Sequence, residues 1–193
     1  MSGIKSVAVF CGSRVGFDPA FAEAMRLLGR GLAEAGIRLV YGGGRIGLMG
    51  ILADATVAAG GEVAGVIPDF LQRAEVAHPG LTELVVTDTM HSRKMRMSQL
   101  ADAFLTMPGG LGTLDETIEI ITWRQLKLHD KPILICDVNG SARPLLAALG
   151  AAIAMGFARP DASDLYEPIE GVAAVLARLT GLPATLSGTS ALV

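Results

Sequence analysis

A glycine-rich segment near the middle of the chain carries the residues best suited to chemistry. It reads MPGGLGTLDE, from Met107 to Glu116, and stands where a helix is expected to begin. Bare glycines let backbone N–H groups approach a ligand closely, and a helix start carries partial positive charge that favours an anion. The segment therefore predicts a phosphate cradle with a carboxylate, Glu116, beside it.

A purely structural interpretation also explains part of this segment. Thr113 and Glu116 have the spacing of a capping box, in which Thr113 begins the helix and Glu116 bonds back to the Thr113 N–H. A cap does not require the glycines that strip the preceding loop of side chains. On this segment alone both interpretations stay open.

Two further loops that contain glycine and few large side chains follow expected strands. Cys11-Gly-Ser13 follows the first strand, and Gly42-Gly-Gly-Arg-Ile-Gly47 follows the second. The chain has neither the dinucleotide spacing G-x-G-x-x-G at its first turn nor a Walker pattern, so NAD and ATP are not favoured. We expect a nucleoside monophosphate or sugar phosphate, with these residues of the glycine loops among its contacts: Ser13, Gly43, Gly44, Gly109, Gly110, Gly112 and Thr113.

A cluster of cations opens another expected helix, in the segment MHSRKMR from Met90 to Arg96. Positive side chains near a helix start oppose the helix dipole, and an anionic partner would remove that conflict. Arg93 and Lys94 are therefore candidates for the ligand site, whereas Arg96 is assigned to solvent. The competing interpretation is a solvated basic helix face.

Short apolar runs alternate with helical patterns along the chain and place these loops. Strands are expected at 4–10, 37–41, 62–67, 83–87, 103–107 and 132–136, and helices at 19–36, 47–59, 89–101, 113–128, 144–155 and 172–179. Residues 68–80 are expected to be irregular. The alternation predicts an α/β fold: a single-domain, Rossmann-like, doubly wound parallel sheet flanked by helices, which puts the loops after strands at one edge. We assign 1–182 to this domain and 183–193 to a flexible tail.

Composition narrows the class of partner. The 193 residues carry a net charge of −3 and are 51% hydrophobic, so they show no electrostatic footprint for nucleic acid or an anionic membrane. No apolar run is long enough for a spanning helix, and we expect a soluble, cytoplasmic protein. Cys11 and Cys136 sit in apolar runs and are expected to be buried free thiols. The three histidines, His78, His91 and His129, are scattered, so no metal site is expected.

Taken together, P-G-G-x-G-T-x-x-E at Pro108–Glu116, the Arg93-Lys94 pair and YGGGRIGLMG resemble the LOG ("lonely guy") family of cytokinin riboside 5′-monophosphate phosphoribohydrolases. The resemblance runs from the first strand to about Asp137. It implies hydrolysis of the N-glycosidic bond of N6-modified adenosine monophosphates, giving free base and ribose 5-phosphate, without a cofactor. It implies that Arg93 and Glu116 are catalytic. Implied substrate contacts are Glu75, Lys94, Gly110, Leu111, Gly112, Thr113, Leu114, Asp115 and Thr122. Asp115 departs from the glutamate often found there: it keeps the charge but has a shorter reach.

Alternatives to this activity are a broader AMP or purine nucleoside monophosphate nucleosidase and a non-catalytic nucleotide-binding regulatory module. The lysine decarboxylase label often given to this family is disfavoured, because Lys94, Lys127 and Lys131 lack the supporting groups that a pyridoxal phosphate site needs. The apolar set on the helix after the motif is broader than one face requires, and with the family resemblance it predicts a homodimer. That set comprises Ile118, Ile121, Trp123, Leu126 and Leu128.

Overall fold

Seven parallel strands form one sheet in the computed structural model, which describes residues 3–75 and 77–182. Their order across the sheet is β4-β3-β2-β1-β5-β6-β7. The predicted doubly wound α/β fold is therefore confirmed. The strands are β1 (Ser6–Phe10), β2 (Arg38–Tyr41), β3 (Val63–Pro68), β4 (Glu83–Thr87), β5 (Ala103–Thr106), β6 (Ile133–Asp137) and β7 (Glu167–Glu170).

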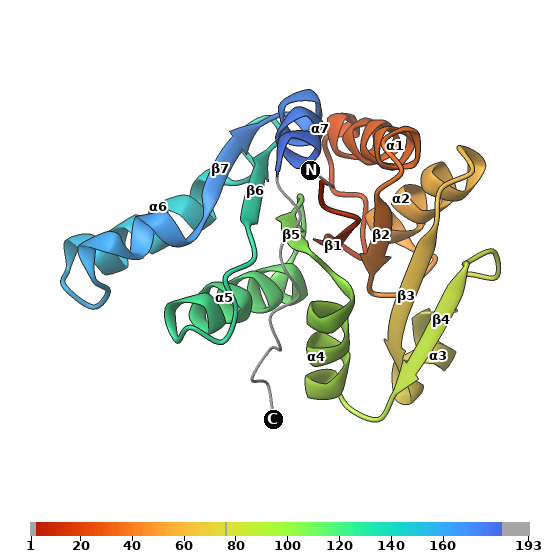
Figure 1. The fold of residues 1–193 in the computed structure, drawn as a ribbon, viewed down its shortest axis with the longest axis horizontal. Coiled ribbons are helices and arrows are strands. Elements are labelled where there is room, and N and C mark those ends of the chain that lie inside the picture. Colours follow the sequence, from red (N-terminus) through yellow and green to blue (C-terminus); the bar gives the residue numbers. More distant parts are fainter. Residues whose placement is uncertain (1–2, 76, 183–193) are drawn as a thin grey trace.

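Helices cover both faces of the sheet (Figure 1). The buried side chains of α1, α2 and α7 pack on one face, and those of α4, α5 and α6 pack on the other. The central strands β1, β3 and β5 are buried along their whole length, as expected for parallel strands covered on both sides. The helices are α1 (Pro19–Glu34), α2 (Gly47–Ala58), α3 (Asp69–Glu75), α4 (Met90–Leu100), α5 (Leu111–Gln125), α6 (Arg143–Ala154) and α7 (Val172–Gly181).

The chain reverses its winding direction between β1 and β5. From β1 the strands β2, β3 and β4 are added on one side, and from β5 the strands β6 and β7 are added on the other. The register pairs Val7 with Ala103 and Phe10 with Thr106, so β1 and β5 end side by side. In sheets of this kind ligands bind at the switch point, beyond the carboxyl ends of the strands. The glycine loops after β1 and β5 meet at that point.

Three elements differ from the sequence-based expectation. The segment 68–80, expected to be irregular, contains the short helix α3, and its backbone bridges the loop after β2 through Ala77 and Gly44. Strand β7 and the 3-10 turn Pro160–Leu165 were not expected. Strand β7 alternates half-buried and exposed residues. With a glutamate at each end and a proline within it, its sequence lacks the apolar run that marks a central strand. The predicted tail 183–193 lies outside the described residues.

Within the described part of the chain, no helix is long and apolar enough to cross a membrane.

Candidate active site

Backbone hydrogen bonds join the loops after β1, β2 and β5 at the carboxyl edge of the sheet. The Gly12 N–H donates to the carbonyl of Pro108 at 3.0 Å, which ties the first loop to the MPGGLGTLDE loop. The Gly12 carbonyl in turn accepts from Leu48 N and Met49 N at 3.0 and 3.3 Å. The three glycine loops therefore lie together, as the sequence predicts.

The three loops are not equivalent as anion cradles. Leu48 and Met49 belong to the first turn of α2, and their N–H groups are already bonded to Gly12. The second glycine loop therefore supports the first one. Helix α5 begins differently: Gly110 is its N-cap and supplies no side-chain cap, and the first bond within the helix runs from Leu114 N to Gly110 O. The N–H groups of its first turn point beyond the helix end, where an anion is favoured.

Glycine is needed in this loop for two different reasons. A Cβ on Gly109 would lie 2.6 Å from the Thr113 Cβ and 2.9 Å from Gly12 N, so only glycine lets the two loops pack. A Cβ on Gly110 or Gly112 would meet no atom within 4 Å. These two positions border open space and place no side chain of their own at the approach to the α5 N-terminus.

The capping-box interpretation of Thr113 and Glu116 is wrong. Helix α5 starts at Leu111, so Thr113 stands in the first turn and Glu116 in the second. Thr113 is buried and packs beside Gly109. Its carbonyl accepts from the Thr117 hydroxyl at 2.7 Å, and Thr117 contacts the Thr106 hydroxyl at 2.8 Å. This buried series of hydrogen bonds fixes the first turns of α5 against the end of β5.

A capping box does exist, but it opens α4. The Thr89 side chain accepts from Ser92 N at 3.0 Å, and the Ser92 hydroxyl accepts from Thr89 N at 3.0 Å. The box uses serine in place of the usual glutamate or glutamine, and so the sequence pattern did not reveal it. By fixing the first turn of α4, it fixes the helix from which Arg93 and Lys94 extend.

Arg93 is buried, with 5% of its surface exposed, and its guanidinium bonds to the backbone of β3 and of the loop after β2. Nε donates to the carbonyl of Val66 at 3.0 Å, and Nη2 donates to the carbonyl of Gly42 at 2.9 Å. Nη1 has a longer contact, 3.8 Å, with the Met90 sulfur. Because the carbonyls are neutral, they orient the guanidinium without cancelling its charge.

Glu116 is buried to a similar degree, with 9% of its surface exposed. It lies close enough to Cys11 for its charge to act on the thiol, and so does Arg93. Burial raises the pKa of Cys11, the Glu116 carboxylate raises it further, and the Arg93 guanidinium lowers it. Cys11 directly follows strand β1, so the two predicted catalytic residues both lie near the carboxyl end of β1, at the switch point.

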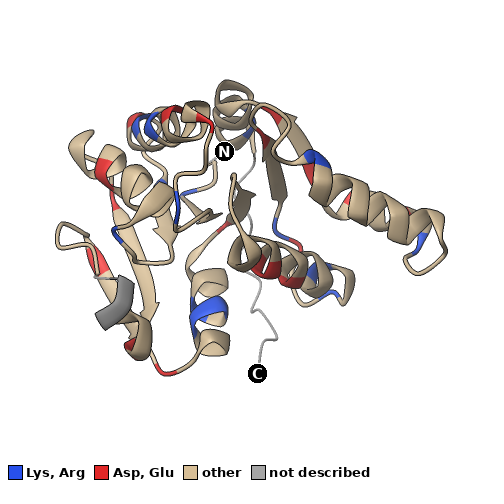
Figure 2. Ribbon diagram, turned by 180° about the vertical axis from the view of Figure 1, so that it is seen from behind, with Lys and Arg blue, Asp and Glu red and all other residues tan. Residues whose placement is uncertain are grey.

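Lys94 differs from Arg93 because it forms ion pairs within the protein. Its Nζ lies 2.8 Å from a Glu119 carboxylate oxygen and 3.1 Å from an Asp115 carboxylate oxygen. Burial alone would lower the pKa of Lys94, but the bonds to Glu119 and Asp115 outweigh it and raise the pKa. Figure 2 shows this charge pattern, with basic residues on α4 beside acidic residues on α5. The sequence reasoning did not identify Glu119, whose spacing of three from Glu116 resembles any helix face.

The other predicted contacts are spread over the same edge. Ser13 is exposed in the first loop, Gly43 and Gly44 are buried in the second, and Leu111 and Leu114 are exposed on α5. Thr122 lies beyond Leu114, nearer the C-terminus of α5. Its hydroxyl donates to the Ile118 carbonyl at 2.8 Å, a bond that threonines inside helices commonly form. Glu75 ends α3, and its side chain lies outside the described residues.

No group of three or more histidine, cysteine, aspartate or glutamate side chains suited to a metal ion occurs among the described residues. Both cysteines are free and buried, as predicted.

Comparisons with known proteins identify relatives along most of the chain. A family model described as possible lysine decarboxylase matches residues 49–179. A cytokinin riboside 5′-monophosphate phosphoribohydrolase of Rhodococcoides fascians is 44% identical over 176 residues, covering 89% of each chain. The LOG7 enzyme of the same name from Arabidopsis thaliana is 44% identical over 159 residues, covering 82% of this chain and 73% of the relative.

A solved structure shares the fold at much lower identity. The molybdenum cofactor binding protein of Rippkaea orientalis superposes with a TM-score of 0.67 and 18% identity, covering 90% of this chain and 93% of the other. This likeness concerns the architecture alone.

The lysines do not fit the decarboxylase description of the family model. A Schiff-base lysine must be neutral to react, and the ion pairs of Lys94 favour its charged form. Burial lowers the pKa of Lys131, but that residue donates to Ser98 O ahead of β6, at the amino edge of the sheet and away from the glycine loops. The site and the named relatives agree instead with the motifs in the sequence. The chain belongs to the LOG family, whose named members are cytokinin riboside 5′-monophosphate phosphoribohydrolases.

Proposed function

We propose that this protein hydrolyses the N-glycosidic bond of N6-modified adenosine 5′-monophosphates, the cytokinin nucleotides, and releases free base and ribose 5-phosphate. The observation that carries the proposal is the pairing of an uncapped, glycine-lined helix start with two buried charges, Arg93 and Glu116, beside the same switch point. The named relatives act on such nucleotides. A phosphorylated substrate also fits the cytoplasmic setting expected from the sequence.

The phosphate binds at the N-terminus of α5. The N–H groups of Leu111, Gly112 and Thr113 lie in the first helical turn, where they have no partner within the helix. The open space beside Gly110 and Gly112 admits the phosphate to them. Holding the phosphate there fixes the ribose and removes much of the entropic cost of aligning C1′ for reaction.

Glu116 acts on the sugar as the bond to the base breaks. Cleavage passes through an oxocarbenium-like ribose, and a buried carboxylate stabilises that positive charge more strongly than water does. Glu116 can also accept a proton from the water whose oxygen bonds to C1′. The electron pair of the broken C–N bond leaves with the base, which takes up one proton, so that one water is consumed per base released.

Arg93 supplies positive charge next to this carboxylate. Its bonds to Val66 and Gly42 fix the guanidinium plane, so its charge needs no rearrangement when the anionic substrate arrives. It offsets the repulsion between the phosphate and Glu116, which would otherwise weaken binding. A module that only binds nucleotides would gain from having no buried carboxylate at this place, and this favours an enzyme.

The activity is tested by incubating the purified protein with isopentenyladenosine monophosphate and, separately, with AMP. Free base and ribose 5-phosphate are then quantified by chromatography. Release of both products in equal amounts from the N6-modified substrate is expected. Faster release from AMP would indicate the broader purine nucleotidase. Binding of both nucleotides without any release would overturn the enzyme in favour of the regulatory module.

We also propose that two copies associate through α5. The outer side of this helix exposes Leu114, Ile118 and Leu126, and Leu126 has 63% of its surface exposed. Together with Trp123 and Leu128 these residues line a shallow apolar depression. An apolar patch of this kind is typical of a protein interface. Analytical ultracentrifugation is expected to give a dimer at micromolar concentration, and Ile118→Glu is expected to give a monomer. A wild-type monomer under these conditions would contradict the dimer.

A further inference from the structure

A buried histidine outside the predicted site lies beside the second glycine loop. His78 has 9% of its surface exposed, and its backbone N–H donates to the Gly43 carbonyl at 3.2 Å. The preceding residue, Ala77, forms an isolated antiparallel bridge with Gly44. The segment that precedes β4 is therefore bonded to the loop that follows β2.

Two side-chain bonds fix the orientation of His78. Gly80 N donates to Nδ1 at 3.1 Å, so that Nδ1 is an acceptor and the proton lies on Nε2. Nε2 then donates to Asp54 Oδ1 at 2.8 Å. The imidazole thus joins its own turn to helix α2, the helix that follows the second glycine loop.

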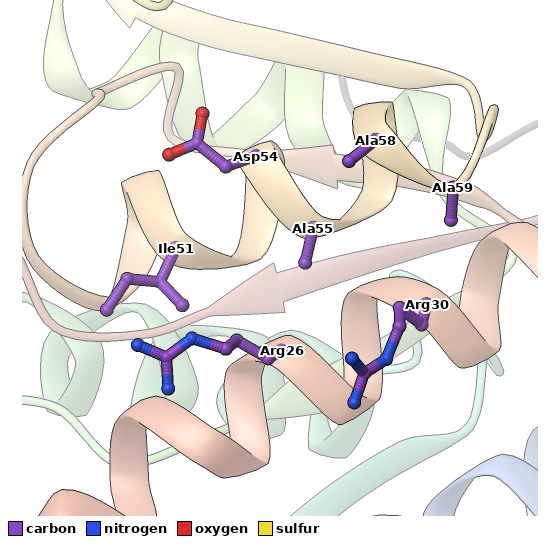
Figure 3. Close-up of a pocket in the computed structure, with 7 residues that line it drawn as sticks. All are labelled: Arg26, Arg30, Ile51, Asp54, Ala55, Ala58 and Ala59. Carbon is purple, nitrogen blue, oxygen red and sulfur yellow. The ribbon is translucent and has the colours of Figure 1, made fainter.

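Asp54 contributes its carboxylate from the surface of α2. Its side chain is 74% exposed. It lies at the border of the groove between α1 and α2, and its carboxylate points away from Arg26 and Arg30, which extend from α1 (Figure 3). Those two arginines instead pair with Glu23, at 3.3 and 3.8 Å. The Asp54 carboxylate therefore bonds to the histidine, while the two arginines that line the groove pair with Glu23.

The loop held by His78 is the loop that holds Arg93. Gly42 accepts from Arg93 Nη2, and Gly43 is the next residue. Gly43 has a φ of +78°, and a Cβ there would lie 3.1 Å from Ile67 Cβ and 3.4 Å from Val66 N. Val66 is the residue whose carbonyl accepts from Arg93 Nε. A shift of Gly43 would therefore displace the adjacent Gly42 carbonyl, one of the two that orient the guanidinium.

We propose that the Asp54–His78 pair is a positioning device for the reaction, which acts through Gly43 and Gly42 to fix Arg93. The inference rests on the proposed function, because its consequence is measured as turnover. His78 touches neither the substrate nor the reacting atoms in this scheme. Its effect is therefore expected on kcat, through the geometry of Arg93, and not on the affinity of the phosphate cradle at α5.

Three variants separate the two bonds of the imidazole. In His78→Gln the amide nitrogen can replace Nε2 as donor to Asp54, and in His78→Asn the amide oxygen can replace Nδ1 as acceptor from Gly80. Asp54→Ala removes the carboxylate and leaves the histidine. We expect kcat for the N6-modified nucleotide to fall about tenfold or more in His78→Asn and in Asp54→Ala, since small misplacements of catalytic groups have effects of this size. His78→Gln is expected to stay within about threefold of wild type.

Two further measurements, the dissociation constant for AMP and thermal unfolding, distinguish a positioning role from simple loss of stability. The dissociation constant for AMP, measured by calorimetry, is expected to change less than about threefold in all three variants, because the α5 cradle is untouched and Arg93 keeps the charge that offsets the repulsion of Glu116. Arg159→Ala is the control, as it removes an exposed ion pair with Asp161 far from the site in the chain. Thermal unfolding of each variant gives the folded fraction to which kcat is normalised.

The outcomes are distinguishable. If the wild-type protein releases no base, the proposed function fails, whatever the variants do. If the wild-type protein is active and His78→Asn and Asp54→Ala have wild-type kcat per folded molecule, the positioning role is wrong. Equal losses in His78→Gln and His78→Asn would also overturn it, because the bond to Asp54 would then have no part in the effect.

Discussion

The Arg93 guanidinium donates to the carbonyl of Gly42 at 2.9 Å, so a residue of the fourth helix is fixed by the loop after the second strand. A second bond, from Nε to the carbonyl of Val66 at 3.0 Å, fixes the plane of the group. Both acceptors are backbone atoms of adjacent strands, β2 and β3, or their loops. The sheet itself therefore sets the position of this charge, and a flexible side-chain partner is not required.

Arg93→Lys is expected to lower kcat by about a hundredfold or more, although the charge is kept. An ammonium group is a compact charge, and it cannot reproduce the planar fork that bonds to Gly42 and Val66 together. Arg96→Lys is the matched control, because Arg96 lies on the same helix and its guanidinium donates to the Gln99 side chain at 3.5 Å, away from the two carbonyls that orient Arg93. Steady-state kinetics with the N6-modified nucleotide measure both. Near-wild-type kcat in Arg93→Lys would contradict the assigned role.

Glu116→Gln is expected to lower kcat by at least about a hundredfold while nucleotide binding is kept or strengthened. The amide has nearly the same shape, but it cannot stabilise a cationic ribose or accept a proton from water. It also no longer repels the phosphate. Asp130→Asn, an exposed change in the loop between α5 and β6, is the control. Calorimetry with AMP and single-turnover kinetics separate the two effects, and unchanged turnover in Glu116→Gln would remove this residue from the mechanism.

Sequence reasoning located the edge of the sheet that carries the site but misjudged how helix α5 begins. The alternation of apolar runs and helices is a strong signal, and so the doubly wound sheet and the meeting of the glycine loops were predicted. The Thr113–Glu116 capping box was wrong because the pattern matches a cap whether or not the helix has already started at Leu111. The N–H groups that follow the second glycine loop, those of Leu48 and Met49, are already bonded to Gly12, whereas the loop before α5 leaves its N–H groups to a ligand. This difference depends on long-range backbone bonds that no local pattern contains.

Contacts between segments distant in sequence were the least predictable. His78 was noted only as one of three scattered histidines, and its bond to Asp54 spans 24 positions. Lys94 was predicted to contact substrate, and its ion pairs with Asp115 and Glu119 depend on how α4 packs beside α5. The catalytic role of Arg93 and Glu116 stays a prediction that the kinetic experiments address.

The buried thiols are expected to make stability fall at high pH. Burial, with the nearby Asp137 carboxylate, raises the pKa of Cys136 to about 11, and burial also raises that of Cys11. In the unfolded chain both thiols ionise near pH 9, so above that pH the unfolded state releases protons that the folded state keeps. Their contribution to stability is thus complete below pH 9 and is lost as the pH rises towards 11. Thermal unfolding between pH 8 and 10.5 checks this, and Cys136→Ala is expected to show a shallower decline than wild type.

Gly109→Ala and Gly110→Ala are expected to fail in different ways. At Gly109 a methyl group would crowd Thr113 and Gly12, so the loops must separate, and both Tm and nucleotide affinity are expected to fall. At Gly110 a methyl group meets no protein atom within 4 Å, so Tm is expected to stay the same or rise slightly. The same methyl group stands at the open approach to the α5 N-terminus, where it excludes the phosphate, and the KM is expected to rise about tenfold or more. Thermal unfolding and steady-state kinetics give both quantities. A Gly110→Ala protein with wild-type Tm and wild-type KM would show that the phosphate binds elsewhere.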